Sequence, residues 1–394
     1  MSVRIAVNGL FLARPHTGMG RYTLGLLGAL PAAMRDAEFV VFVPDKLPRS
    51  LKLPSAVRTV VVPIGRSLLG RGKAIDEWER SKLGLAASQL KAHLIFQPYP
   101  TPPIRNPYKV PVVMAVHDVI PWQLPRYRRA LRSRLKLRGV LDGIRRADRI
   151  VTVSRTSAKA ITWASQVPAE RISVTYEGLE PAYSKQPASA AMAAVRKRFG
   201  LQRPFVLYVG GYDYRKNVRR LIQGFAESGL AGGSGGSGKS AGHDLVLAGA
   251  VTAPASALYE DFHKLPQLIA QAGIGRRTKV LGFVSEADKR TLLAAADAFA
   301  FPSLAEGFGL PILEALAAET PVAASDIPIN QELFPGAYEP FRPDRTDELA
   351  KALRDAALEP DSAKVARGTE AVARYTWPAA AERTAAAFTQ LLEK

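Results

Sequence analysis

The chain has 394 residues, a length that suits two domains of ordinary size, each able to bury a full core. It contains no cysteine, so disulfide bonds and thiolate metal sites are excluded. The formal net charge is +19, which favours anionic partners such as phosphorylated small molecules, acidic lipid or nucleic acid.

No apolar run approaches the roughly 20 residues that a membrane-spanning helix needs. The opening residues, MSVRIAVNGLFLARPH, carry a short apolar stretch broken by Asn8 and Gly9, which indicates a strand and a turn and not a signal peptide. The five histidines are scattered, and none forms a metal-binding pair such as HExxH. We therefore expect a cytoplasmic protein that holds no metal.

Strand-like segments alternate with helical segments along the whole chain, which indicates the α/β class with parallel sheets and crossover helices. In the first half we expect strands at Val3–Val7, Phe39–Val43, Thr59–Val62, Leu94–Gln97, Val112–Val116 and Ile150–Val153. The helices expected between them are Gly20–Leu30, Trp78–Leu90, Tyr127–Gly143 and Ser157–Ala164.

A polar, alanine-rich stretch follows at Leu179–Gly200, and a second alternating series comes after it. Its expected strands are Phe205–Val209, Asp244–Ala248, Val280–Leu281, Ala298–Phe301 and Val322–Ser325. Its expected helices are Val218–Glu227, Leu265–Ala272, Glu286–Ala294, Pro311–Ala318 and Asp347–Ala357. We predict a first domain at residues 1–185, a second at residues 200–375, and a terminal helix, Trp377–Leu392, within residues 376–394.

Residues 232–238, GGSGGSG, have the composition of a flexible linker and predict a surface loop. Residues Gly233 to Ser240 also match the phosphate-binding pattern GxxxxGKS, but a working loop of that kind joins a strand to the helix after it. Here a helix precedes the stretch and a strand follows, so we attribute the match to composition.

Four segments place candidate binding groups at the carboxyl ends of strands, where ligands bind in open α/β sheets. The first is Gly18-Met19-Gly20, which follows the first strand and opens a helix. Its backbone N–H groups can approach an anion closely. The alternative is an ordinary tight turn.

The second segment, GGYDYRKN, follows the first strand of the second half. It places Arg215 and Lys216 just before a helix, where a guanidinium fork and an ammonium suit a diphosphate. The alternative is a solvated pair of cations.

The third segment, PSLAEGFGLPILEA, follows a strand and enters a helix near Pro311. Glu306 and Glu314 flank the helix start, where each carboxylate can bind a pair of sugar hydroxyls. The positive end of the helix is also an anion or hydroxyl site. The backbone N–H groups that crowd it belong to Gly307, Phe308, Gly309 and Leu310. The alternative is a capped helix with surface glutamates.

The fourth segment, HDVIP, places His117 at the carboxyl end of an apolar strand. We predict that this imidazole contacts donor or acceptor. The alternative is a structural histidine.

Taken together, EGFGLPILEA, HDVIP, GGYDYRKN and ASDIP resemble the motifs of the retaining GT-B glycosyltransferases known as glycosyl transferases group 1. That group includes bacterial mannosyl- and glucosyltransferases of surface polysaccharides. The resemblance covers nearly the whole chain, and YTWPAAAERTAAAF is similar to the closing helix that crosses back to the first domain. It implies two Rossmann-like domains facing a central cleft, with acceptor binding by the first and nucleotide-sugar binding by the second.

The resemblance also implies roles for particular residues. Arg215 and Lys216 would stabilise the departing nucleoside diphosphate, while Glu306 and His117 would contact the sugar. The donor would also contact Gly18, Met19, Gly20, Gly282, Phe283, Val284, Gly307, Phe308, Gly309, Leu310 and Glu314. Within that set, Gly282 to Val284 would line the base pocket and Glu314 would bind the ribose.

Two positions depart from the family pattern. Many relatives carry Arg or Ser where Gly211 stands, which puts one phosphate contact in doubt. Relatives usually carry Gly where Glu319 stands, in the loop after the helix of the third segment. The sequence alone does not explain this second change.

The implied reaction uses no metal or other cofactor, because Arg215, Lys216 and helix-terminal N–H groups can stabilise the charge of the leaving group. Retention would come from same-face attack, with a donor phosphate oxygen accepting the proton of the acceptor. Glu306 is not expected to be a nucleophile. GDP-mannose is the first donor expected, ahead of UDP- and dTDP-sugars, and the acceptor expected is a glycan or a polyprenyl-diphosphate-linked glycan.

Residues Arg126 to Arg149 contain ten Arg or Lys and two Asp. With Leu131, Leu135 and Leu137 among them, a helix here would present a basic face and an apolar edge to an anionic bilayer. We predict peripheral attachment at the inner face of the cytoplasmic membrane, and the alternative is a solvated helix.

The net charge also permits a nucleic-acid-binding protein without transferase activity, but no helix-turn-helix, zinc or RNA-binding signature supports it.

Overall fold

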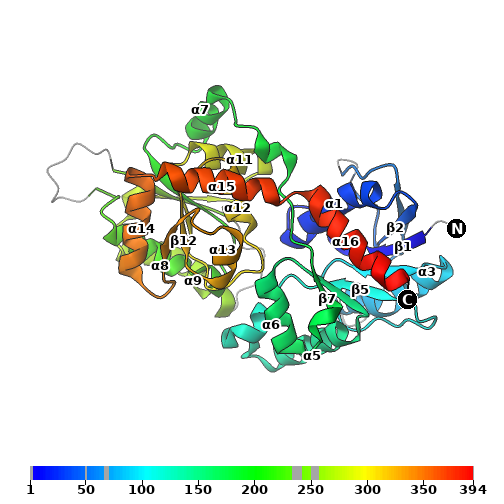
Figure 1. The fold of residues 1–394 in the computed structure, drawn as a ribbon. Helices are drawn as coiled ribbons and strands as arrows, with labels where there is room; N and C mark the ends of the chain where they lie inside the picture. Colours follow the sequence, from blue (N-terminus) through cyan, green and yellow to red (C-terminus); the bar gives the residue numbers. More distant parts are fainter. Residues whose placement is uncertain (1–2, 49–50, 66–70, 233–241, 250–256, 394) are drawn as a thin grey trace. The chain divides into compact units, whose positions relative to one another are not determined.

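The computed structural model describes residues 3–48, 51–65, 71–232, 242–249 and 257–393, and it divides into two compact units (Figure 1). The first unit is Met1–Gly178 together with Tyr375–Lys394, and the second unit is Leu179–Arg374. The phosphate-loop match at Gly233 to Ser240, with most of the Gly/Ser run, lies outside the described residues.

The first unit contains a seven-stranded sheet whose paired strands all run parallel. Its strands, in order across the sheet, are β3 (Val57–Val61), β2 (Ala37–Val43), β1 (Val3–Asn8), β4 (Leu94–Gln97), β5 (Val112–Ala115), β6 (Arg149–Thr152) and β7 (Ile172–Val174). The strand order reverses between β1 and β4, which marks the switch point where ligands bind in such sheets.

Helices enclose this sheet because its inner strands are buried and apolar on both faces. They are α1 (Gly18–Ala33), α2 (Arg71–Glu77), a π-helix (Trp78–Lys82), α3 (Leu83–Gln89), α4 (Ile120–Gln123), α5 (Leu131–Arg146), α6 (Arg155–Ser165) and α16 (Trp377–Leu392). The terminal helix α16 lies beside α1 (Figure 1). A β-carbon on Gly25 would stand 2.1 Å from the Trp377 ring, so glycine permits this close approach.

The second unit repeats the plan with six parallel strands. Across the sheet they are β10 (Thr278–Gly282), β9 (Asp244–Ala248), β8 (Phe205–Val209), β11 (Ala298–Phe301), β12 (Val322–Ser325) and β13 (Glu339–Phe341). Its helices are α7 (Ser189–Arg198), α8 (Val218–Glu227), α9 (Glu260–His263), α10 (Leu265–Gln271), α11 (Glu286–Ala295), α12 (Leu310–Ala317), α13 (Pro328–Leu333), α14 (Thr346–Leu358) and α15 (Ser362–Arg374). The switch point lies between β8 and β11.

The predicted class, α/β with two Rossmann-like units, is confirmed. Several short or weakly apolar elements were not predicted: β7, β13, α2, α4, α7, α9, α13 and α15. The helix expected at Trp78–Leu90 contains a π turn, and the one expected at Tyr127 begins at Leu131 because Pro125–Arg128 forms a 3-10 turn. Among the described residues, no helix is long and apolar enough to cross a membrane.

Candidate functional site

The loops after β8 and β11 bring together three of the residues predicted from the sequence. A 3-10 turn at Tyr214–Lys216 follows β8, and Asp213 caps it by accepting a hydrogen bond from the Arg215 backbone N–H at 3.2 Å. Glu306 lies between β11 and α12, where its Oε1 is 2.6 Å from Lys216 Nζ and 2.6 Å from Arg215 Nη1. The cluster therefore forms at the switch point of the second sheet.

The cluster is charged although it is largely buried, since the side chains of Lys216 and Glu306 are each 9% exposed. Burial opposes ionisation of Glu306, but Arg215 and Lys216 outweigh it and lower the pKa of this carboxyl to about 2. Burial and the adjacent Arg215 lower the pKa of Lys216, and Glu306 acts against that shift. One carboxylate oxygen thus lies between two cations, which are groups that can also bind a phosphate oxygen.

The start of α12 has the geometry predicted for an anion or hydroxyl site. Gly309 precedes the helix with φ of 100°, a conformation that strains any residue with a β-carbon. Pro311 occupies the first turn and has no N–H group, so the backbone N–H groups nearest this helix end belong to the neighbouring Gly307–Leu310 segment. The positive end of the helix therefore lies in the same loop as Glu306.

Glu314, the predicted ribose ligand, is buried and bound to a cation that the sequence analysis missed. Lys289 Nζ is 2.9 Å from Glu314 Oε1 and 2.9 Å from Glu286 Oε2, and it lies 5.6 Å from the centre of the Tyr183 ring. The signal in the sequence was a lysine on the apolar face of α11, beside Leu292. This pairing holds Glu314 in a fixed position at 1% exposure.

The predicted base pocket, Gly282 to Val284, begins at the last residue of β10, at the carboxyl end of the same sheet. Gly282 has φ of 68°, and its carbonyl accepts a hydrogen bond of 2.8 Å from the Gly249 N–H. The Phe283 side chain is 67% exposed, which suits a ring that stacks on a base. The loops after β8, β10 and β11, which carry most of the site residues predicted in the second unit, thus share one edge of its sheet.

In the first unit, Gly18-Met19-Gly20 opens α1 as expected, and Thr17 caps it through a hydrogen bond of 3.2 Å from the Gly20 N–H. A β-carbon on Gly20 would stand 2.2 Å from the Arg14 carbonyl oxygen, so packing alone requires glycine at this position. A β-carbon on Gly18 would meet nothing within 4 Å, and Met19 is 38% exposed. Gly18 and Met19 are therefore accessible to a ligand.

His117 follows β5 and has a protein partner at each ring nitrogen. Its Nδ1 is 3.2 Å from Glu177 Oε1, and its Nε2 is 3.0 Å from the Pro98 carbonyl oxygen. Both partners are acceptors, so the geometry suits the imidazolium, with two N–H donors. Burial works to lower the pKa of His117, but Glu177 and the Pro98 carbonyl outweigh it and raise that pKa above its ordinary value.

A buried polar network at the switch point of the first sheet was not predicted. Asn8 Nδ2 donates to Gln97 Oε1 at 2.8 Å and to the Tyr99 hydroxyl at 2.6 Å, and Tyr99 donates to Glu79 on the π-helix. Burial raises the pKa of Glu79, and the nitrogen of Gln97 has no hydrogen-bond partner among the described residues. The sequence feature that could have indicated this network is that two buried strands, β1 and β4, each end in a residue with a polar amide side chain.

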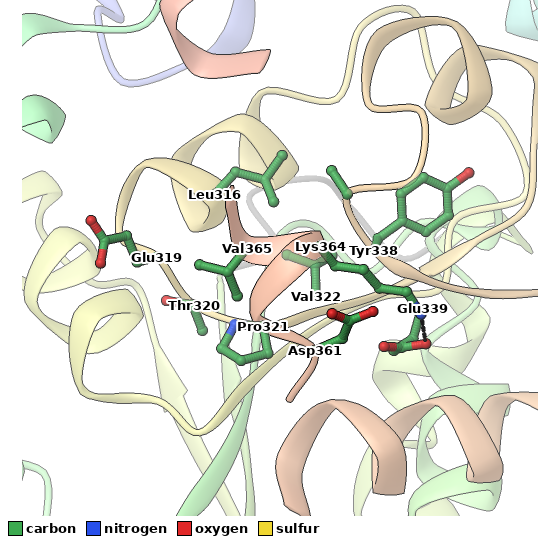
Figure 2. A pocket seen from close by; sticks show the side chains of 11 residues that line it. Leu316, Glu319, Thr320, Pro321, Val322, Tyr338, Glu339, Asp361, Lys364 and Val365 are labelled. Carbon is green, nitrogen blue, oxygen red and sulfur yellow. Dashed lines mark hydrogen bonds and ion pairs between the residues drawn. The ribbon is translucent and has the colours of Figure 1, made fainter. Parts of the chain in front are cut away.

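A cavity elsewhere in the second unit is unrelated to this chemistry. It measures about 10 Å³, room for about one water, and lies beside Val322 and Glu339 at the amino ends of β12 and β13 (Figure 2). Lys364 of α15 pairs with Glu339 across it. Among the described residues, no group of three or more His, Asp or Glu is placed to hold a metal ion.

Comparison with known proteins gives one consistent family. Residues 194–369 match the model for glycosyl transferases group 1, and residues 16–183 match that for Glycosyltransferase Family 4. The chain is 26% identical over 379 residues to the O-antigen chain mannosyltransferase B of Escherichia coli. The alignment covers 92% of this chain and 93% of that protein.

Two solved structures share the fold over nearly the full length. Sucrose-phosphate synthase from Thermosynechococcus elongatus superposes with a TM-score of 0.73 at 20% identity and covers 99% of each chain. HepE from Anabaena, in complex with UDP, superposes with a TM-score of 0.69 at 20% identity, and the match covers 98% of this chain and 100% of HepE.

Proposed function

Because this chain belongs to the glycosyltransferases, with residues 194–369 in group 1, we propose that it transfers a hexose from a nucleotide-diphosphate sugar with retention of configuration. Mannose is the favoured sugar and GDP-mannose the favoured donor, since the E. coli relative that matches 92% of this chain is a mannosyltransferase. The acceptor is a glycan or a polyprenyl-diphosphate-linked glycan in surface-polysaccharide synthesis. UDP-sugars come second, because HepE was solved with UDP.

The observation that carries the proposal is the cluster of Arg215, Lys216 and Glu306 beside the start of α12. The acceptor oxygen attacks the anomeric carbon on the face that the nucleotide leaves, and the bond to the phosphate oxygen breaks. The acceptor proton passes to that phosphate oxygen. The two cations and the helix-terminal N–H groups stabilise the charge that develops there, without a metal.

The test is release of nucleoside diphosphate from GDP-mannose by the purified chain in EDTA. We expect slow release alone and faster release with an acceptor glycan, with less from UDP- or dTDP-sugars. Lost activity in EDTA that Mg²⁺ restores would contradict metal independence. The transferase proposal itself fails if none of these donors is consumed while the folded chain binds duplex DNA at moderate salt.

We further propose that α5 attaches the chain to the inner face of the cytoplasmic membrane. Arg134 and Arg138 lie beside Leu131 and Leu135 at helical spacing, and all four are exposed, the leucines at 71% and 57%. Each cation near an anionic surface contributes on the order of 1 kcal/mol, and the leucines can enter the interface.

Sedimentation with vesicles of acidic lipid tests the attachment. Binding should fall with salt and should be lost in Arg134→Glu/Arg138→Glu, while affinity for GDP stays unchanged. The matched control reverses two exposed cations of the second unit, Lys197→Glu and Arg203→Glu, and should bind as the wild type does. Equal binding by both double variants would contradict the role of α5.

A further inference from the structure

A groove of about 640 Å³ runs along the edge of the first sheet, far larger than the cavity in the second unit. Its sheet wall is formed by Phe42 of β2, Val60 of the edge strand β3 and Val62 just after that strand, and α3 supplies Leu85 and Ala86 opposite. This volume falls within the range of small-molecule sites, about 300–1,000 Å³. The groove is therefore large enough for a ligand.

The groove exists because the apolar cluster beneath it is incompletely covered. Val60, Val62 and Ala86 pack against that cluster but are only partly buried. Two other apolar side chains of the lining are open to solvent, Leu85 at 50% and Val61 at 43% exposure. A concave strip of exposed aliphatic surface of this kind is typical of a binding site for an apolar group.

One end of the groove is fixed by the π-helix. Trp78 Nε1 donates to the Val62 carbonyl at 2.5 Å, and Lys82 Nζ donates to the Pro63 carbonyl at 2.7 Å. That bond uses one of the three donors of the Lys82 ammonium, so two can serve a ligand. The cation is therefore held where the apolar strip ends.

The lining carries positive charge and no negative charge. Lys82 and Arg58 are its charged residues, and Gln89 is the remaining polar side chain. Arg58 is 3.0 Å from Glu38, which partly neutralises it, so Lys82 is the cation best placed for an anionic group. Aliphatic walls with an ammonium at one end match a hydrocarbon chain that bears a phosphate.

We propose that this groove binds the hydrocarbon chain of an anionic lipid, with the lipid phosphate at Lys82. The ligand class rests on the lipid-linked acceptor of the proposed function, whereas the groove and its charge are properties of the first unit alone. The groove would hold the lipid carrier while the sugar end is free to reach the carboxyl edge of the same sheet.

Binding of dodecyl phosphate to the full chain, measured by calorimetry below the critical micelle concentration, tests the proposal. We expect saturable binding that weakens roughly fourfold for each methylene removed. Leu85→Glu should lower affinity at least tenfold, and Gln89→Glu, a milder change, should also weaken binding. Lys82→Ala should weaken binding of dodecyl phosphate but not of dodecanol.

The matched control is Leu358→Glu, since Leu358 is also 50% exposed but lies in α14 of the second unit. Unchanged binding of dodecyl phosphate in all three groove variants, or equal binding of inorganic phosphate and dodecyl phosphate, would overturn the proposal. Release of GDP from GDP-mannose, measured on the same proteins, separates the two ideas. A wild type that transfers sugar but binds no lipid refutes the groove alone, and one that binds lipid but consumes no donor refutes the transferase alone.

Discussion

Lys216 and Glu306 form an ion pair of 2.6 Å that joins two loops 90 residues apart in the sequence. The pair lies at the switch point between β8 and β11, and the ammonium also stands 5.2 Å from the centre of the Phe301 ring. These contacts fix a buried cation at the place where ligands bind in such a sheet. Electrostatic stabilisation of a leaving group requires charges held in fixed positions in this way.

Lys216→Ala should lower the turnover of GDP-mannose by about 10²–10³, the usual loss when a preorganised charge-stabilising group is removed. The readout is steady-state release of GDP. Lys197→Ala, at an exposed position in α7, serves as the control and should turn over as the wild type does. Full activity in Lys216→Ala would remove this residue from the catalytic set.

Glu306→Gln should destabilise the protein without nucleotide and increase the stabilisation that GDP gives against thermal unfolding. Without the carboxylate, Arg215 and Lys216 repel each other in a buried place, a loss on the order of 3 kcal/mol. GDP replaces the missing negative charge, so its stabilising effect in thermal unfolding should exceed that on the wild type. Glu348→Gln, which removes the solvated partner of Arg342, should leave both measurements unchanged. A smaller GDP effect in Glu306→Gln would refute this account.

His117 should make the first unit more stable on the acidic side of neutrality. Its folded pKa is raised above 6.5 by Glu177 and the Pro98 carbonyl against the effect of burial, so the folded state binds a proton more tightly than the unfolded state. This stabilisation is complete below pH 6.5 and is lost as pH rises through the folded pKa. NMR titration of the imidazole should give a pKa above 6.5 that falls in Glu177→Gln. Identical titration in both proteins would contradict the pairing.

Glu319→Gly should stabilise the second unit by about 1 kcal/mol. Glu319 has φ of 58° and stands two residues after the end of α12. Its N–H donates to the Leu316 carbonyl at 3.1 Å, and the Thr320 N–H donates to the Ala315 carbonyl at 3.0 Å. That closing turn of the helix favours glycine, the residue that the resemblance to the family leads us to expect there. Glu319→Ala keeps the β-carbon and should show little of the gain in chemical denaturation. Equal stabilisation by both variants would assign the effect to charge.

The sequence predicted those features that depend on short segments. Strand ends such as Val209 and Phe301 could be placed because long apolar runs stop there, and the start of α12 because Gly309 and Pro311 punctuate it. The candidate anion site follows from these ends alone, since parallel strands present their carboxyl ends on one edge. The sequence could predict that these residues lie at the same edge of the sheet, but it could not predict which of them contact one another.

The features that depend on distant partners were not predictable. Lys289 meets Glu314 only because α11 packs beside α12, and His117 meets Glu177 across 60 residues. The π turn at Trp78–Lys82 inserts an extra residue into an otherwise helical pattern and so changes which side chain turns inward. A regular helical reading of that segment gave no reason to single out Glu79.

Glu79 offers the sharpest test of whether the switch point of the first sheet is functional. Glu79 is 8% exposed. Burial raises the pKa of its carboxyl, and hydrogen bonds from Tyr99 and Asn8 act against this shift. Because the pKa is raised, the folded state binds the proton of Glu79 more tightly than the unfolded state does. Stability should therefore fall as pH rises from about 4.5 through the folded pKa. Glu79→Gln should unfold at a higher temperature than the wild type at pH 8, and this advantage should disappear below pH 4.5.

A buried carboxylate that lowers stability at neutral pH is typical of a functional site, and acceptor hydroxyls are the groups expected at this edge of the first unit. Glu79→Gln should thus raise the KM for the acceptor about tenfold, while release of GDP from GDP-mannose without acceptor stays unchanged. Tyr99→Phe, which removes the hydroxyl between Asn8 and Glu79, should shift the KM in the same direction without the gain in stability. A Glu79→Gln protein that is more stable at pH 8 and keeps the wild-type KM would show that the network serves only the fold.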